Sequence, residues 1–132
     1  MAYVRVKGLE PLMAAFQAAG ENAPRFARKA LAEEAAEAFI LSQAVVPVRY
    51  GDLRASGVVH PATLIGNVAR AEITYGGPSV PYAIYVHEIP PSRATHDYPT
   101  RWKYLEHPVR LYAKGMAARM TTRVLDMINR GF

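Results

Sequence analysis

Hydrophobic and polar residues alternate along residues 3–7 and 68–75, which is the period-two pattern of half-buried strands. Residues 58–65 and 68–75 flank a Gly-Asn pair that suits a two-residue hairpin turn with glycine first. Pro61 lacks the backbone N–H of a strand ladder, so we expect the first arm to be an edge strand or to carry a bulge. The sequence therefore predicts a small antiparallel sheet, made of this hairpin and an N-terminal strand.

Three other stretches repeat apolar residues every three or four positions, which is the spacing of a helix with one buried face. Residues 11–19 predict a short helix that Gly20 ends, and residues 22–44 predict a long alanine-rich helix with an asparagine cap, ended by Pro47. Residues 108–130 predict one continuous C-terminal helix. The buried face of the long helix is expected to hold Phe26, Ala27, Ala30, Leu31, Ala35, Ala38 and Leu41. The apolar stripe of the last helix is Val109, Tyr112, Met116, Met120, Val124 and Met127.

The segments between these elements carry residues typical of turns and loops. Gly51 and Asp52 predict a turn, with Leu53 beside them as an apolar anchor. Residues 82–88 are too few for periodicity to distinguish a helix from a strand, and the prolines of residues 90–99 predict an irregular segment. These patterns predict an α+β fold, in which a small antiparallel sheet packs against the long alanine-rich helix and the long C-terminal helix.

The composition fits one folded domain over residues 1–132, because 51% of the residues are hydrophobic and 20% are charged. Lys and Arg number 16 against 11 Asp and Glu, and the net charge of +5 suits contact with an anionic partner or an acidic protein surface. The chain has no cysteine, which excludes disulfides, thiolate catalysis and the usual structural zinc sites. The N-terminus has no apolar run as long as that of a signal peptide, and no apolar run in the chain is long enough to span a membrane. We therefore expect a soluble protein with no membrane partner.

The most distinctive side chains lie in residues 80–109, which hold three of the four histidines and the only tryptophan. HExxH is absent, and no pair of histidines has the separation that metal-binding helices require. We therefore expect no metal, no cofactor and no catalytic residue, and we interpret the polar residues as a hydrogen-bonded network that holds a proline-rich loop. The candidates for acid-base chemistry or metal binding are His87, Glu88, His96, Asp97, Glu106 and His107.

The sequence also bears on nucleophilic catalysis and on nucleic-acid binding. Ser56 lies in RASG rather than in a GxSxG nucleophile motif, and the glycines form no phosphate-binding motif. Residues 101–104 interleave basic and aromatic side chains, which can bind phosphates and stack on bases. In a strand, the same alternation places Trp102 and Tyr104 in the core and Arg101 and Lys103 in solvent. A nucleic-acid-binding module and a metal-dependent hydrolase remain as alternative functions.

From about Leu31 onward, the order of these segments resembles that of the minor capsid, head–tail joining (tail completion, or neck) proteins of tailed bacteriophages. Three patches carry the resemblance, and two departures accompany it: Tyr50 stands where the family commonly has threonine, and Ile89-Pro90-Pro91 replaces a glycine-containing step. The first patch is Pro47, Gly51, Leu53, Arg54 and Ser56. The second is Tyr82, Ala83, Val86, His87 and Glu88. The third is Lys103, Tyr104, Leu105, Glu106 and Pro108.

The resemblance implies a non-catalytic structural protein of the virion, made in the host cytoplasm, whose copies form a ring at the neck. By the same resemblance the ring has six or twelve copies, and its partners are the connector or stopper protein and the tail-terminator protein, with DNA in the channel lumen as a further candidate. The residues expected to contact neighbouring subunits or partners are Arg49, Tyr50, Leu53, Arg54, Tyr82, Tyr85, His87, Glu88, His96, Arg101, Trp102, Lys103, Tyr104 and Glu106.

Overall fold

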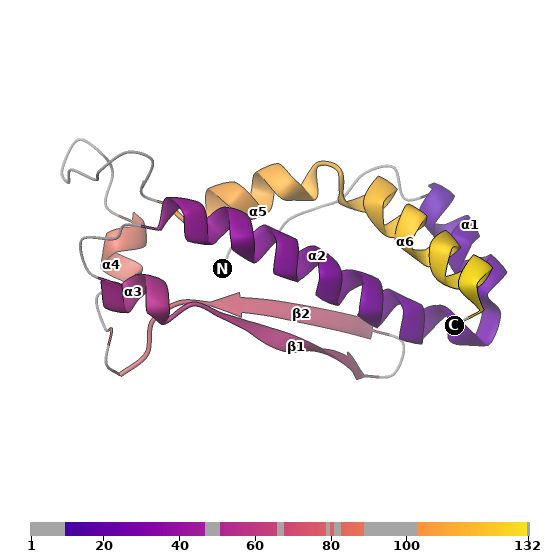
Figure 1. The fold of residues 1–132 in the computed structure, drawn as a ribbon, viewed down its shortest axis with the longest axis horizontal. Helices are drawn as coiled ribbons and strands as arrows, with labels where there is room; N and C mark the ends of the chain where they lie inside the picture. The colour runs from indigo at the N-terminus through magenta and orange to yellow at the C-terminus, as the bar shows by residue number, and fades with distance from the viewer. Residues whose placement is uncertain are drawn as a thin grey trace.

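The structure is a computed structural model, and it describes residues 10–46, 51–65, 68–78, 80, 83–88 and 103–131. Its elements are α1 (Glu10–Ala19), the 3-10 turn η1 (Gly20–Asn22), α2 (Ala23–Val45), α3 (Gly51–Ala55), β1 (Val58–Ile65), β2 (Val68–Thr74), α4 (Ala83–Glu88), α5 (Glu106–Ala113) and α6 (Met116–Arg130). The long helix α2 runs through the molecule, with the β1–β2 hairpin along one side and α5 and α6 along the other (Figure 1). The α+β prediction is confirmed. The predicted N-terminal strand and the proline-rich loop lie outside the described residues.

The hairpin is antiparallel, and Val59 lies opposite Ile73 in its register. The register shifts between His60 and Thr63, so β1 carries the bulge that was expected from Pro61. Alternate residues of β2 are half-buried and exposed, in agreement with the sequence pattern, and α2 packs against both strands. The hairpin thus has one face covered by α2.

Helix α2 follows from its alanine content, and it ends where Val46 takes an extended conformation before Pro47. Leu41 was expected on the buried face but is 43% exposed, because adjacent residues point about 100° apart on a helix and Ser42 holds the buried position. An i, i+4 row along the helix is buried from end to end: Phe26, Ala30, Glu34, Ala38 and Ser42.

The junction between α1 and α2 departs from the predicted cap. Gly20 ends α1 as expected, with a φ of 60° that favours glycine. Asn22, however, makes no capping hydrogen bond; it has helical dihedral angles, and its side-chain oxygen accepts from Arg25 Nη2 at 3.0 Å. No side-chain cap forms because η1 leads directly into α2. The N–H of Ala23, at the start of α2, donates instead to the carbonyl of Gly20.

The C-terminal region is two helices, which corrects the prediction of one continuous helix. The break falls at Lys114 and Gly115, between α5 and α6. A side-chain carbon at Gly115 would lie only 2.5 Å from Nη1 of Arg119, and Nη2 of Arg119 donates to the carbonyl of Tyr112 across the break. Arginine therefore uses the space that glycine leaves open.

Two shorter segments are also settled by the structure. Gly51 and Asp52, predicted as a turn, begin the short helix α3, and Leu53 within it is fully buried, as an anchor should be. Residues 83–88 form a helix, which decides between the two possibilities left open by the sequence. The described part of the chain holds no helix that is long and apolar enough to span a membrane.

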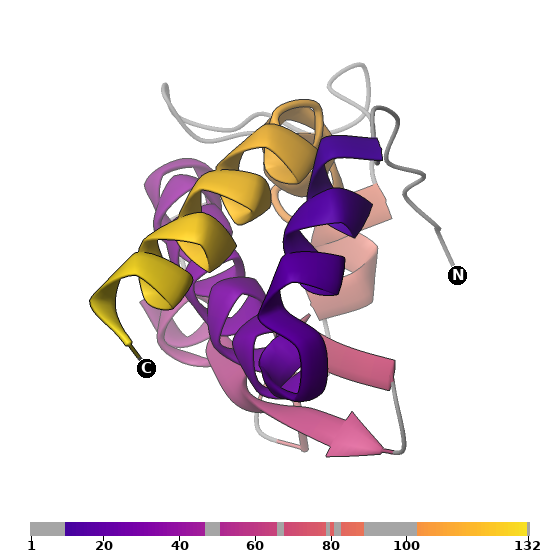
Figure 2. The ribbon, with the colours of Figure 1, turned by 90° about the vertical axis from the view of Figure 1, so that its right-hand side faces the viewer.

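Two separate apolar cores lie toward opposite ends of α2. The first joins α1, α2 and α6, which stand side by side in the end-on view of Figure 2. Its buried residues are Leu12, Ala15, Phe26, Ala30, Met120, Val124 and Met127. The second lies where α2 ends and joins α3, α4 and the residues before α5. Its buried residues are Val46, Leu53, Val80, Ala83 and Tyr104.

Candidate functional site

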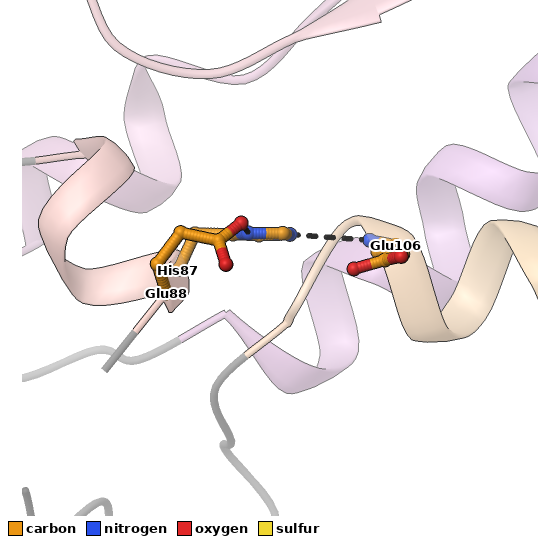
Figure 3. Close-up of side chains that lie close together, drawn as sticks. All are labelled: His87, Glu88 and Glu106. Carbon is orange, nitrogen blue, oxygen red and sulfur yellow. Dashed lines mark hydrogen bonds and ion pairs between the residues drawn. The ribbon is translucent and has the colours of Figure 1, made fainter. Parts of the chain in front are cut away.

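Four polar side chains meet at the surface above the second core, and we call them the Lys103 network: His87, Glu88, Lys103 and Glu106. Helix α4 supplies the first two, Lys103 lies just before α5, and Glu106 is the first residue of α5 (Figure 3 shows His87, Glu88 and Glu106). Lys103 Nζ lies 2.5 Å from Glu88 Oε2 and 3.0 Å from Glu106 Oε2. A cation therefore stands between two carboxylates. The sequence predicted a hydrogen-bonded network that holds the proline-rich loop, and since that loop lies outside the described residues, this part stays a prediction.

Tyr104 is the buried support of this network. Its hydroxyl donates to the carbonyl of Ala83 at 2.8 Å, and its own carbonyl accepts from Ser42 Oγ at 2.7 Å. Its ring meets those of Tyr75 and His87 edge to face, with centroids 5.1 and 4.9 Å apart. Burial raises the pKa of the Tyr104 hydroxyl above its ordinary value, so the group stays a neutral donor. The tyrosine thus ties α2, α4 and the start of α5 together.

Both ring nitrogens of His87 are used within the network. The Glu106 backbone N–H donates to Nε2 of His87 at 3.3 Å. The neutral imidazole therefore carries its proton on Nδ1, and this nitrogen donates to Glu88 Oε1 at 2.9 Å. The histidine side chain is only 17% exposed, so these contacts fix its orientation.

Lys103 has the only described non-glycine backbone with a positive φ, at 54°. Side chains rarely adopt this conformation, and here the Lys103 N–H donates to the carbonyl of His87 at 2.8 Å. Hydrogen bonds from Lys103 lower the pKa values of Glu88 and Glu106, and the bond to Glu88 is the first cause that raises the pKa of Lys103. All three groups are therefore held in their charged forms.

The same residues include a group with the ligand types of a metal site. One ligand atom each from His87, Glu88 and Glu106 lies within 4.8 Å of the others. Nitrogen and carboxylate ligands suit several divalent metals. However, the Lys103 ammonium already lies between the two carboxylates, and an ion would have to displace it. The arrangement fits a network of internal ion pairs better than a metal centre.

The other predicted contact residues are buried, exposed or outside the described set. Leu53 and Tyr104 are buried in the second core, 0% and 2% exposed, so they pack beneath the Lys103 network and are not available for contacts with a partner. Arg54 is exposed on α3, and its Nε donates to Gln43 Oε1 at 3.2 Å. Tyr85 belongs to α4, but its side chain is outside the described set. Six further predicted residues lie outside the described residues altogether: Arg49, Tyr50, Tyr82, His96, Arg101 and Trp102.

Sequence analysis missed a second charged group, the Glu34 cluster, made of Glu34, Tyr112, Arg119 and Arg123. Glu34 is fully buried, and its carboxylate accepts from Arg119 Nε at 2.9 Å and from Arg123 Nε at 3.0 Å. The Arg119 guanidinium also lies 3.6 Å from the centroid of the Tyr112 ring. A signal was present, because Glu34 lies in the apolar i, i+4 row of α2. The cluster joins α2 to α5 and α6.

A scan against protein-family models found no match, and searches of curated proteins and of solved structures found no similar protein.

Proposed function

We propose that this protein is a non-catalytic structural protein of a tailed bacteriophage, which forms a ring at the neck of the virion and joins the head connector to the tail. The observation that supports this most is that the three separated sequence patches resembling neck proteins meet in one apolar core. Leu53 comes from the first patch, Ala83 from the second and Tyr104 from the third. Because the patches are distant in sequence, their meeting indicates that they form one structural unit.

The surface of this unit suits contacts between proteins. Glu88 is half exposed and acidic, and Arg54 on α3 is exposed and basic. A closed ring needs head-to-tail contacts between two different, complementary surfaces. A surface held in place by Tyr104 and Lys103 also loses little conformational freedom on docking. The partners are a second copy, the connector or stopper protein and the tail-terminator protein, while the net charge of +5 also suits DNA in the channel.

Light scattering tests this function through the mass of the purified protein, alone and mixed with the connector and tail-terminator proteins encoded beside its gene. A closed ring, or a complex with either neighbour, is the expected result. Arg54→Glu should weaken that assembly, since it reverses a charge on the proposed surface. Arg130→Glu is the matched control, because Arg130 is exposed near the end of α6, away from this surface.

Two other outcomes would replace the proposal. A protein that binds neither neighbour but shifts a DNA fragment, with affinity that falls steeply with salt, would be a nucleic-acid-binding module. Zinc or manganese bound in stoichiometric amounts, with a hydrolytic activity that His87→Ala abolishes, would indicate a metal-dependent hydrolase.

A further inference from the structure

The two edges of the hairpin differ in their capacity to pair with another strand. β1 contains Pro61, which lacks an N–H, and its register shift disturbs the regular spacing of its backbone groups. β2 has no proline, and no other described strand pairs with it. Figure 2 shows both strands of the hairpin, in pink, below the helices. Of the two edges, β2 is the one that suits a further strand.

The register determines which backbone groups of β2 face outward. Ile65 and Val68 are paired across a two-residue hairpin loop. The residues that close such a loop form a hydrogen-bonded pair, in which the two backbones exchange N–H···O bonds. Hydrogen-bonded and non-hydrogen-bonded pairs alternate along an antiparallel ladder. The N–H and C=O groups of Ala69, Ala71 and Ile73 therefore point away from β1, toward the edge at which no other described strand pairs.

We infer that the free protein pairs with a second copy of itself through β2, about a two-fold axis at Ala71. An antiparallel pair centred on Ala71 places Ala71 opposite its own copy and Ala69 opposite Ile73 of the other chain, with all outward backbone groups bonded. The same register places Arg70 opposite Glu72, and Glu72 opposite Arg70. The strand is thus complementary to itself in both hydrogen bonds and charge.

The surroundings of Arg70 and Glu72 favour a second copy of the chain as the strand that pairs with β2. Arg70 and Glu72 are exposed on the face of the hairpin away from α2, and within the described residues neither forms an ion pair. In the pairing each charge gains a partner at a non-hydrogen-bonded position, where cross-strand side chains are closest. The inference is independent of the proposed neck function, because it concerns the free chain and a surface on a different element.

Charge reversal tests the register. Arg70→Glu places glutamates opposite one another, and Glu72→Arg places arginines opposite one another, so each should raise the dimer dissociation constant about tenfold or more. The double variant, with both charges exchanged, restores opposite pairs and should dimerise like the original chain. Sedimentation over about 1 µM to 1 mM protein measures all four forms. Circular dichroism confirms that each variant keeps its fold.

A cysteine at the two-fold axis gives a second readout. The chain has no cysteine, so Ala71→Cys introduces the only one, and the two copies would lie about 5.5 Å apart between Cα atoms, within disulfide range. Mild oxidation should give a covalent dimer. Ala69→Cys is the matched control, because in this register each copy lies opposite Ile73 and cannot reach the other.

Three results would overturn the inference. The protein could be monomeric at all concentrations tested, both single charge reversals could leave the dimer dissociation constant unchanged, or Ala69→Cys could crosslink as readily as Ala71→Cys. A ring or a complex with phage neighbours that persists in the Arg70→Glu variant would support the neck proposal without bearing on β2. Conversely, a β2 dimer that binds neither neighbour would leave the pairing intact and remove the neck proposal.

Discussion

The Glu34 cluster and the Lys103 network are opposite in charge but alike in design. In the first, one carboxylate lies between two guanidinium groups; in the second, one ammonium lies between two carboxylates. Their exposure differs: the central Glu34 is 0% exposed, whereas the central Lys103 is 20% exposed and its partner Glu88 is 52% exposed. Removing the central charge of a buried triad leaves uncompensated charges in a poorly hydrated site, while water replaces much of an exposed one. The same geometry therefore serves packing in one place and surface structure in the other.

The largest expected effect is that of Glu34→Ala. It removes the carboxylate that accepts charge-assisted hydrogen bonds from Arg119 and Arg123, while Arg123 keeps its ion pairs with Glu33 and Glu37, so the free energy of unfolding should fall by about 3 kcal/mol, measured by urea denaturation. Glu37→Ala is the control on the same helix. Glu37 pairs with Arg123 at 2.9 Å but is 47% exposed, and its loss should cost at most about 1 kcal/mol. Equal losses in the two variants would show that burial does not distinguish these ion pairs.

An intermediate effect is expected for Tyr104→Phe, which tests the buried support of the Lys103 network. The variant removes the hydroxyl that donates to the carbonyl of Ala83, and the unsatisfied group should lower the free energy of unfolding by about 1–3 kcal/mol. Tyr112→Phe makes the same chemical change in the Glu34 cluster, where the hydroxyl lies 3.5 Å from Glu34 Oε2. This longer contact should contribute less. A larger loss for Tyr112→Phe would reverse the comparison.

The smallest expected effect is the pH dependence of the exposed network. Folding lowers the pKa values of Glu88 and Glu106 below the ordinary 4.5, so their stabilising contribution is present above pH 4.5 and is lost as the pH falls through the lowered values. Folding raises the pKa of Lys103 above 10.5, so its contribution is lost only at higher pH. Between these limits the network is intact.

Thermal unfolding of the wild-type chain and of Lys103→Met measures this contribution. Lys103→Met should lower Tm slightly at pH 7, and the difference from wild type should shrink as the pH drops below 4.5. Comparing the two proteins removes the effect of other carboxylates that titrate in the same range. A difference that grows on acidification would contradict the assigned role of Lys103.

The sequence predicted features that depend on local pattern. The hairpin, its bulge at Pro61, the end of α1 at Gly20 and the burial of Leu53 follow from turn chemistry, proline geometry and periodicity. The sequence analysis placed His87, Glu88 and Glu106 in a hydrogen-bonded network that holds the proline-rich loop, which lies outside the described residues, and it did not include Lys103. In that network only the fold shows that the lysine lies between the two glutamates.

The errors arose where tertiary contacts decide between similar local patterns. The apolar stripe is continuous through Gly115, yet the helix breaks there because Arg119 folds across the gap toward Tyr112. The position of Glu34 in the buried i, i+4 row of α2 was a signal, but only the fold shows that Arg119 and Arg123 from α6 bind its carboxylate. The causes differ in range, since the partners of Glu34 lie more than 80 residues later in the chain, whereas Arg119 and Tyr112 are only seven residues apart.

The division into two cores along α2 has a consequence for local opening. Leu12 and Val124 belong to one core, and Leu53 and Tyr104 to the other, and the described structure joins them mainly through this single helix. Amide hydrogen exchange should therefore separate two cooperative units, which open at different free energies. A change that opens the end with Tyr104 should then leave the protection of the α1–α6 end unaltered.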